Sequence, residues 1–251
     1  DTESFNTARD EFAKVNQQED MCIDKERLKK ILGKLQPWKA PGHDGVQGFW
    51  YKRFTSLHER LVIHLSDILN SGSPLAWMTL RRTVLVPKDV TKGSTPSNFH
   101  PITRLPTAWK ILTAMVSYSL YKFLDNNHIL PWEQKGCMRG SRGTKDHSLI
   151  DKNVMKASIE RRTNLILGRI DYRKAYDMVP HSWIKETLST LKASSSITKL
   201  ICNSMAKWTT NLESNGKHLG TVSINRRIFQ GDSLSPLLFV MAVIPWTVLL
   251  Q

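Results

Sequence analysis

The stretch LILGRIDYRKAYDMVP, residues 165–180, decides the fold that we expect for this chain. Its first six residues are mostly apolar, which predicts a buried strand over residues 165–170. Asp171 follows at the strand end, where a sheet can fix a carboxylate as an oxygen ligand for Mg²⁺. For this stretch alone, an Asp that only ends a strand explains the pattern equally well. Asp177 lies beyond the strand end and is not expected to be a ligand, and Pro180 opens a helix.

The composition indicates a folded and strongly basic protein. Hydrophobic residues make up 40% of the 251 residues, enough for one large domain or two small ones with a real core. Lys and Arg number 36 against 22 Asp and Glu, which gives a formal net charge of +14. This excess favours a polyanionic partner, nucleic acid or an anionic membrane, and a merely basic surface is the alternative.

The cysteines and the N-terminus bound the cellular context. Cys22, Cys137 and Cys202 are odd in number and far apart, so neither a disulfide framework nor a zinc site is expected, and a reducing compartment is the simpler interpretation. The first residues carry no basic start and no apolar core, and they are not expected to be a signal peptide. The chain does not begin with Met, which suggests a piece of a longer reading frame.

A tight loop and a long helix are expected in the first third of the chain. The loop WKAPGHDGVQGFW, residues 38–50, can bring Lys39 and its exposed amides to a phosphate backbone, although an ordinary connection between helices explains the loop alone better. Apolar residues spaced by three and four then predict one amphipathic helix over residues 50–68. We expect its aromatic residues Trp50 and Phe54 to lie in the core and not to form a base-stacking platform.

Two basic segments follow in the middle of the chain. Residues 83–86 and 98–105 predict a two-stranded basic hairpin, which suits either a triphosphate or template backbone or a merely solvated face. After a helix over residues 112–123, the loop QKGCMRGSRGTK, residues 134–145, combines glycines with cations. Glycines allow close approach of the backbone and cations suit phosphates, so we favour phosphate contact there. A helix with a solvated basic face is expected over residues 144–162.

The last third of the chain is expected to contain helices and one more hairpin. Helices are predicted over residues 184–191 and 197–208, and the pair Asn215-Gly216 predicts a hairpin turn within residues 209–229. The segment after residue 236 is apolar to its end. Its uninterrupted apolar run is too short for a bilayer, so a buried core helix is expected.

Six blocks in this order carry a resemblance to a known family. They read KLQPWKAPGHDGVQGFWYKRF, VLVPK, NFHPIT, QKGCMRGSRGTKD, RIDYRKAYDMVPHSWI and QGDSLSPLLF. From about Lys34 onward the chain resembles the reverse transcriptase domain of non-LTR (LINE-type) retrotransposons of the R2/R4-like branch. The resemblance implies an α/β (α+β) right-hand polymerase fold with fingers plus an incomplete palm. The implied divisions are an N-terminal polar segment and helix over 1–33, a fingers-like region over 34–164 and a partial palm over 165–251.

The resemblance also assigns roles to individual residues. It makes Asp171 the catalytic Mg²⁺ ligand and Tyr176 the steric gate that excludes a 2′-hydroxyl. The remaining nucleotide-binding assignments are Lys88 at the triphosphate, His100 where the family usually carries a triphosphate-binding Arg, and the pair Gln230 and Gly231 beside the nascent base pair. The expected nucleic-acid-binding residues are Lys39, Gly42 and Gly45 in the template-holding block, with Lys135, Arg139 and Arg142 in the basic loop.

The chemistry implied by the resemblance is RNA-directed DNA synthesis from dNTPs on an RNA template with a DNA primer. It uses two Mg²⁺ ions, with Mn²⁺ as a substitute, and two ions need at least two adjacent carboxylates. The family takes the second carboxylate from a Tyr-x-Asp-Asp turn, and no Asp-Asp pair occurs in these 251 residues. We therefore expect little polymerisation by this chain alone. A nuclear or cytoplasmic location is expected, and no membrane partner.

Three other interpretations stay open. The chain can be a non-catalytic nucleic-acid-binding remnant of a retroelement, which retains the charge and lacks the chemistry. It can be another right-hand polymerase, such as a viral RNA-dependent RNA polymerase, although Tyr176 and the pair Gln230 and Gly231 disfavour that class. It can also be a basic membrane-tethered protein that uses the apolar last helix.

Overall fold

The computed structural model describes residues 2–89, 91, 93, 95, 98–136, 138, 140–172 and 174–250. Within those residues the helices are α1 (Thr2–Glu11), α2 (Lys25–Lys34), α3 (Gly48–Arg53), the 3₁₀ turn η1 (Thr55–Leu57), α4 (His58–Ser71), α5 (Ala76–Thr79), α6 (Thr107–Asn126), α7 (Thr144–Arg161), α8 (Ala175–Met178), α9 (His181–Thr190), α10 (Ser195–Ala206) and α11 (Ser235–Leu249). The strands are β1 (Leu80–Pro87), β2 (Phe99–Arg104), β3 (Thr209–Ser214) and β4 (Lys217–Ser223). The mixed α/β class expected from the sequence is confirmed.

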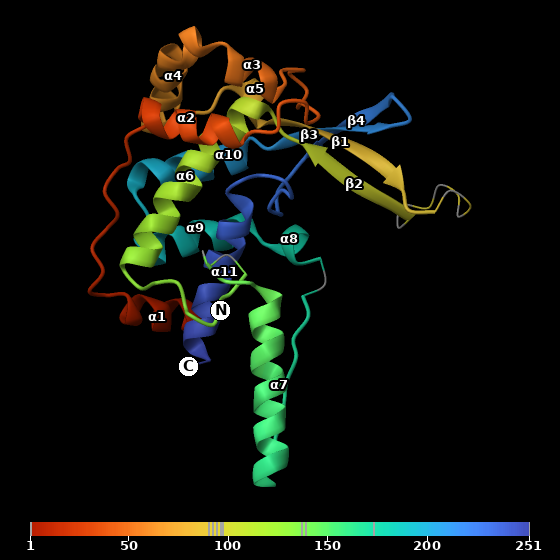
Figure 1. Cartoon of the computed structure of the whole chain (residues 1–251). Coiled ribbons are helices and arrows are strands. Elements are labelled where there is room, and N and C mark those ends of the chain that lie inside the picture. Colours follow the sequence, from red (N-terminus) through yellow and green to blue (C-terminus); the bar gives the residue numbers. More distant parts are fainter. Residues whose placement is uncertain are drawn as a thin grey trace.

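The strands form one mixed sheet in the order β2-β1-β3-β4. β1 pairs antiparallel with β2 and parallel with β3, and β3 pairs antiparallel with β4. Asn215 and Gly216 join the last pair with φ values of 50° and 74°, the left-handed geometry of a tight two-residue hairpin. Both predicted hairpins are therefore confirmed. Figure 1 shows the sheet projecting sideways from the body of helices.

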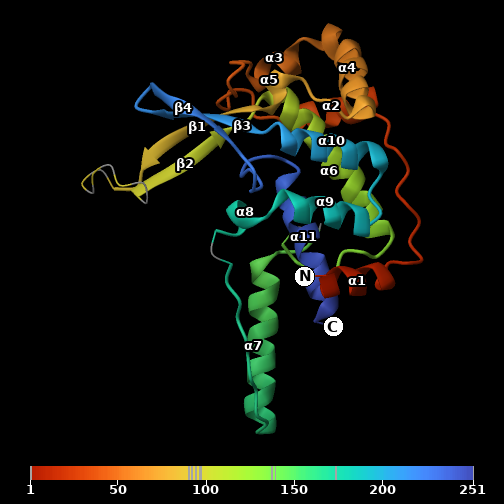
Figure 2. The same ribbon diagram turned by 180° about the vertical axis from the view of Figure 1, so that it is seen from behind.

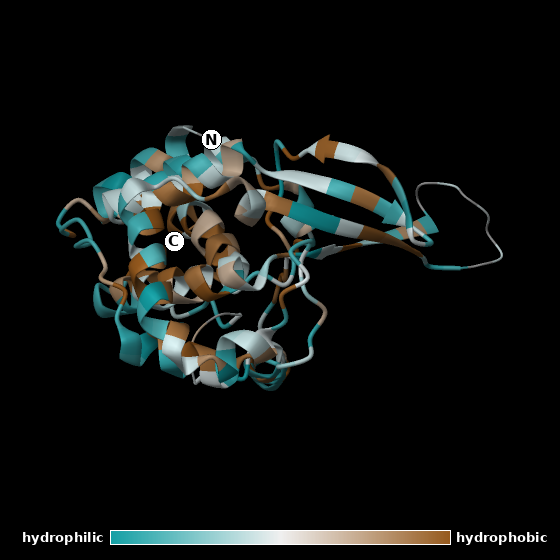
Figure 3. Cartoon of the chain, turned by 90° about the horizontal axis from the view of Figure 1, so that it is seen from above, coloured by the Kyte–Doolittle hydropathy of each residue, from teal (hydrophilic) through white to brown (hydrophobic). Residues whose placement is uncertain are grey.

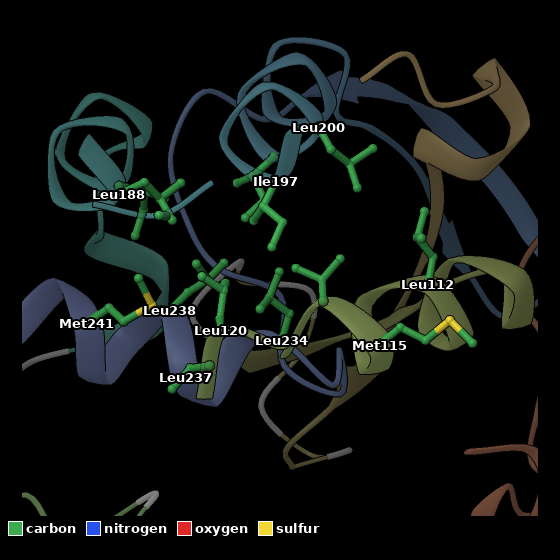
Figure 4. Close-up of a cluster of buried hydrophobic side chains, with 14 of the residues drawn as sticks. Leu112, Met115, Leu120, Leu188, Ile197, Leu200, Leu234, Leu237, Leu238 and Met241 are labelled. Atoms are coloured by element: carbon green, nitrogen blue, oxygen red, sulfur yellow. The ribbon is translucent and has the colours of Figure 1, made fainter. Parts of the chain in front are cut away.

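The core lies among α6, α9, α10 and α11, which turn their apolar faces toward one another. Leu120, Leu188, Ile197 and Leu238 come from these four helices and point into one cluster (Figure 4), and each is at most 4% exposed. Figure 3 shows apolar positions concentrated on the packed helices, with hydrophilic positions around them. The final apolar segment is thus a core helix, as predicted. Among the described helices, none has the length and apolarity needed to cross a membrane.

The N-terminal segment is built into this core. The ring of Phe5 on α1 packs 4.4 Å, centroid to centroid, from that of Trp183 on α9. Further on, the side-chain amide of Gln18 donates to the Ser119 hydroxyl of α6, and its carbonyl oxygen accepts from the Ser194 N–H. The carboxylate of Asp20 accepts both the N–H and the hydroxyl of Ser196 at the start of α10. Residues 2–24 therefore tie three helices together, a role that their polar composition did not indicate.

The single helix predicted over residues 50–68 is wrong, because the chain breaks it at Phe54. Phe54 has φ −82° and ψ 70°, outside helical values, and separates α3 from η1 and α4. The buried His58 ring places Nε2 2.8 Å from the Tyr51 carbonyl oxygen, which fixes this bend. As a result Trp50 and Phe54 are 45% and 48% exposed, so the expectation that they lie in the core is also wrong.

The strand predicted over residues 165–170 is wrong as well. These residues are extended but unpaired, and Ile166 and Ile170 are 95% and 80% exposed. Figures 1 and 2 both show the segment running back alongside α7, which stands away from the body and buries none of its residues. A strand requires hydrogen-bonding partners, and no strand of the described sheet lies beside this apolar run.

Candidate functional site

Tyr176 and the segment that leads to Gln230 are held together by backbone hydrogen bonds. The Ile228 N–H donates to the Tyr176 carbonyl at 2.8 Å, and the Arg227 N–H donates to the Val179 carbonyl at 3.0 Å. The Tyr176 ring stacks on Phe239 of α11, with centroids 5.2 Å apart and planes 12° apart. The structure therefore brings the predicted steric gate close in space to the predicted Gln230-Gly231 pair.

The turn after Ile228 presents Gln230 and Gly231 to solvent. Gly231 has φ 91°, a conformation that favours glycine, and both residues are exposed. The next residue, Asp232, is only 7% exposed, and its Oδ2 accepts a hydrogen bond from the Trp109 indole at 2.8 Å. Its Oδ1 accepts the Leu234 N–H at 3.3 Å. Hydrogen bonds to the buried Asp232 thus hold the turn over residues 228–232 against the body. Gln230 and Gly231 in the same turn stay accessible to a ligand.

Arg81, a residue that sequence reasoning did not single out, lies buried next to this anchor. Its side chain is 0% exposed, and its guanidinium carbon lies 5.1, 5.4 and 5.2 Å from three ring centroids, those of Trp109, Trp208 and Phe229. Nη1 donates to the Met78 carbonyl at 2.5 Å. Burial lowers the pKa of Arg81 to about 10, and the charge of Asp232 opposes that shift. The period-two alternation of β1 could have placed Arg81 on the inner face of the sheet.

The loop over residues 38–47 packs against the start of α6. A Cβ atom on Gly42 would lie 2.5 Å from the Pro106 backbone nitrogen, so the loop touches the chain here with no room for a side chain. The Thr107 hydroxyl donates to the Val46 carbonyl at 2.8 Å. Gly45 has φ 68°, a turn geometry that glycine adopts without strain. Lys39 is exposed beside these glycines.

Lys110 of α6 connects this loop electrostatically to the turn over residues 228–232. Burial lowers the pKa of Lys110, the charge of Lys39 lowers it further, and the carboxylates of Asp232 and Asp44 raise it. Burial in turn raises the pKa of Asp44. Charges on the loop (Lys39 and Asp44) and on the turn (Asp232) therefore both act on one half-buried lysine.

The structure does not bring Lys88 and His100 close to the loop over residues 38–47 or to the turn over residues 228–232. Both are exposed at the far end of the β1–β2 hairpin, where the Lys88 N–H donates to the Asn98 carbonyl at 2.7 Å. Arg81 lies at the other end of β1, and a strand rises about 3.3 Å per residue, so roughly 20 Å of strand separate the two ends. Their predicted contact with a triphosphate stays a prediction.

The basic loop before α7 is held by its own contacts. The Lys135 ammonium lies 4.4 Å from the ring centroid of Trp132, and the Asp146 carboxylate accepts the Arg142 N–H at 2.9 Å. Gly140 and Gly143 have positive φ values, which agrees with a loop that uses glycine for backbone shape. The predicted residue Arg139 lies outside the described residues. Phosphate binding by Lys135 and Arg142 stays a prediction.

Asp171 does not form a metal site with the residues around it. Its side chain is exposed, in the unpaired segment described above, whereas Asp177 forms an ion pair with Arg227 at 3.1 Å. Asp177 thus has an ion-pair partner of its own, and its exclusion from a metal site stays a prediction. Within the described ranges, no three His, Cys, Asp or Glu side chains gather closely enough to hold a metal ion. The described residues therefore provide no donor cluster that fits a pair of ions.

The chain is similar in sequence to one protein family and to two retrotransposon Pol polyproteins. The family model described as "Reverse transcriptase (RNA-dependent DNA polymerase)" matches residues 86–246. Over 208 residues the chain is 31% identical to the "Retrovirus-related Pol polyprotein from type-1 retrotransposable element R2" of Popillia japonica. This alignment covers 82% of this chain and 28% of that protein. Over 203 residues it is 27% identical to the "Retrovirus-related Pol polyprotein from type-2 retrotransposable element R2DM" of Drosophila melanogaster, covering 80% and 18%. The chain thus spans less than a third of the length of either relative.

Proposed function

Since the chain belongs to the reverse transcriptase (RNA-dependent DNA polymerase) family and is related to R2 Pol proteins, we propose that it holds the template and the incoming nucleotide during RNA-directed DNA synthesis. The family implies nucleic-acid templates and dNTP substrates. The proposal adds an RNA template of a non-LTR retroelement, a DNA primer and action on chromosomal DNA in the nucleus. It also keeps the divisions 1–33, 34–164 and 165–251 as N-terminal segment, fingers and partial palm.

One observation carries the proposal. The loop over residues 38–47, Tyr176 and the turn over residues 228–232 converge on α6 and α11, although they lie far apart in the sequence. In this arrangement Gln230 and Gly231 lie against the nascent base pair, Tyr176 lies under the incoming sugar, and the 38–47 loop carries the template.

The family implies a metal-dependent polymerase, and we propose Asp171 as one ligand of the Mg²⁺ pair. A Mg²⁺ pair held with the help of Asp171 would supply activation of the primer 3′-hydroxyl and stabilisation of the leaving pyrophosphate. Asp171 alone does not meet the requirement for two adjacent carboxylates. We propose that residues 165–170 become a strand, and Asp171 a ligand, only when a partner strand with further carboxylates lies beside them.

Binding tests the nucleic-acid part of the proposal. We expect the 251-residue chain to bind an RNA template annealed to a shorter DNA primer more tightly than a blunt DNA duplex, in fluorescence anisotropy titrations. The affinity should fall steeply with salt, and Lys39→Ala and Lys135→Ala should each weaken it, because each removes a phosphate contact. Equal affinity for the two nucleic acids, or affinity independent of salt, would contradict the proposal.

Retention of the nucleotide tests the proposed pocket without any chemistry. The complementary dNTP should slow dissociation of the primer–template, whereas a mismatched dNTP or the matching rNTP should not. In Tyr176→Ala the matching rNTP should slow dissociation as well as the dNTP does. We also expect no primer extension with Mg²⁺. Metal-dependent incorporation by these 251 residues would refute our view that Asp171 needs a partner.

A second candidate function is non-catalytic nucleic-acid binding, and the exposed, isolated Asp171 favours it. This function predicts tight, salt-dependent binding that no dNTP alters and that Asp171→Ala leaves unchanged. A dNTP effect that requires base complementarity would exclude it.

A further inference from the structure

Four aromatic rings form a continuous row around α3. The rings of Trp38 and Phe49 stack with centroids 4.5 Å and planes 16° apart, and those of Trp50 and Phe54 stack at 5.4 Å and 16°. Phe49 and Trp50 connect the two stacks edge to face at 5.2 Å and 84°. We call Trp38, Phe49, Trp50 and Phe54 the aromatic row.

The aromatic row is open to solvent. Trp38 is 65% exposed even though its ring is stacked on Phe49. Trp50 and Phe54, at the other end of the row, are close to half exposed. The helical break at Phe54 turns these rings away from the core. None of the four rings belongs to the hydrophobic cluster that includes α2, α4 and α6, or packs against it. Packing of the hydrophobic core therefore does not explain why these four rings lie together at the surface.

Basic side chains line the hollows on either side of the row. One hollow of about 360 Å³ is lined by Pro37, Trp38, Phe49, Lys52 and Arg53. A second, of about 480 Å³, is lined by apolar and aromatic side chains between residues 46 and 61, together with His58, Arg60 and His64. Neither lining contains an acidic residue.

Two of these basic side chains are held in place. The Lys52 ammonium donates to the carbonyls of Gly33 and Leu35 at the end of α2, at 3.0 and 3.1 Å. The Arg53 guanidinium carbon lies 5.8 Å from the Phe49 ring centroid. Contacts with the end of α2 and with the Phe49 ring therefore hold the positive charges of Lys52 and Arg53 beside the aromatic row.

We propose that the aromatic row is a stacking surface for single-stranded nucleic acid, with the bases on the rings and the phosphates toward Arg53 and Arg60. Flat aromatic faces bind any unpaired base, because every base has a π-face, and adjacent cations neutralise the backbone. A duplex cannot bind in this way, since its bases are already stacked. Linings that carry cations and no acid suit a polyanion better than a second protein surface.

The row begins at Trp38, directly before the proposed template-holding residues 39–45. The inference therefore deepens the proposed function: it names the unpaired template, outside the primer–template duplex, as the occupant. Only that identification rests on the proposed function, because stacking of an unpaired strand can be measured without synthesis.

The test uses the full 251-residue chain and a fluorescein-labelled 12-nucleotide oligouridylate in anisotropy titrations from 50 to 200 mM salt. Trp38→Ala and Phe54→Ala should each weaken binding about 5-fold or more. Arg53→Gln should reduce the slope of log affinity against log salt by about 0.7. Trp38→Phe keeps a ring and should retain most of the affinity. Trp77→Ala, which removes a 38% exposed indole on α5, is the matched control and should change affinity less than about 2-fold.

Two further probes separate the possible occupants. An oligothymidylate of equal length should show the same losses, which identifies stacking rather than recognition of the 2′-hydroxyl. A 12-base-pair RNA duplex should bind the wild-type chain and Trp38→Ala equally. Far-UV circular dichroism and urea unfolding of each variant, together with the Trp38→Phe rescue, distinguish lost stacking from lost fold.

Three results would overturn the inference. If the wild-type chain binds the oligouridylate and the ring variants bind it equally well, the row is not the site and the proposed function stands. If the wild-type chain binds no nucleic acid of any kind, the nucleic-acid part of the proposed function fails as well. Self-association that Trp38→Ala abolishes, with unchanged affinity for RNA, would assign the row to a second copy of this chain.

Discussion

At the scale of single residues, Arg81 is the most unusual group in the described structure. Its guanidinium lies fully buried among three aromatic rings, and its Nε and Nη2 have no hydrogen-bond partner among the described atoms. A buried charge with incomplete hydrogen bonding contributes little to stability, whereas the volume that it fills contributes much. Arg81 also packs against Phe229 in the turn over residues 228–232. Its charge and the volume that it fills can be tested separately by substitution.

Substitution of Arg81 separates these two effects. Arg81→Met keeps most of the volume, and we expect the free energy of unfolding to change by less than about 1.5 kcal/mol. Arg81→Ala leaves a cavity between the rings and should lower the free energy of unfolding by about 3 kcal/mol. Urea unfolding of both variants measures this. A loss from Arg81→Met as large as that from Arg81→Ala would show that the charge itself stabilises the fold.

Gly42 gives a second prediction at this scale. Gly42→Ala places a Cβ atom 2.5 Å from a backbone nitrogen that cannot move freely, so we expect a loss of about 2 kcal/mol or more. Gly33→Ala, inside α2 with nothing within 4 Å, is the matched control and should gain about 0.5–1 kcal/mol from helix propensity. Thermal unfolding compares the two, and similar effects in both would mean that the loop does not pack against α6.

At the scale of elements, the start of α10 is capped locally by Ser194 and, in addition, by Asp20 from a distant part of the chain. The hydroxyl and N–H of Ser196 both donate to Asp20, and these hydrogen bonds lower the pKa of Asp20. A carboxyl group whose pKa is lowered by folding stabilises the fold above its ordinary value near 3.8 and loses that contribution as the pH falls further.

We therefore expect Asp20→Ala to lower the free energy of unfolding by about 1 kcal/mol at pH 7, as for other lost helix caps. The difference from the wild-type chain should shrink as the pH falls below about 3.8, where the wild-type carboxylate becomes protonated. Urea unfolding across this pH range measures it. Glu19→Ala, on the neighbouring exposed residue, is the control, and an equal loss there would argue against capping.

The arm made of α7 and residues 162–172 has almost no contact with the body, and no α7 residue is buried. Its backbone should open at low energy, because few buried contacts oppose local unfolding. We expect limited trypsin digestion to cut first at Arg161, Arg162 or Arg169, with the rest of the chain still folded. Mass spectrometry of the early products tests this. First cuts in β1 or α10 would show that the body opens before the arm.

The elements that the sequence predicted are those with local causes. Asn215 and Gly216 determine their own turn, and the apolar residues of α11 need only the nearest helices to be buried. Residues 165–170 carry an equally clear apolar pattern, but a strand also requires a partner, and a pattern within one segment cannot supply it. Trp50 and Phe54 were misplaced because the break at Phe54 depends on His58 and on packing, not on local propensity.

The candidate site was predictable only in part, for the same reason. Tyr176, Gln230 and Gly231 were identified from a resemblance, and the structure brings them together. Trp109, which holds the turn through Asp232, has no local signal, because this role exists only after α6 packs against the turn. For Arg81 the alternation of β1 indicates an inward side chain but not its three aromatic neighbours. Asp171 is exposed because residues 165–170 pair with no strand. The residues near Asp171 in the sequence do not indicate that the partner strand is missing.

At the scale of the whole molecule, the N-terminal helix is part of the body even though the family match begins at residue 86. α1 packs on α9 and α11, and its Phe5 is 7% exposed. We expect Phe5→Ala to lower the free energy of unfolding of the entire body by about 3 kcal/mol in one cooperative transition. Ile159→Ala, on the exposed arm, should change it by less than about 0.5 kcal/mol. Two separate transitions in urea would show that α1 folds independently.

The parallel pairing of β1 with β3 also sets an order of events during synthesis. About 120 residues separate the two strands, so β1 and β2 leave the ribosome long before β3 exists. At roughly 5–20 residues per second, the open edge of β1 waits for about 6–24 seconds. During that interval Arg81 lacks Trp208 and Phe229, two of its three neighbouring rings, and the β1 edge can pair with other chains, so chaperone binding and fast translation favour the native molecule.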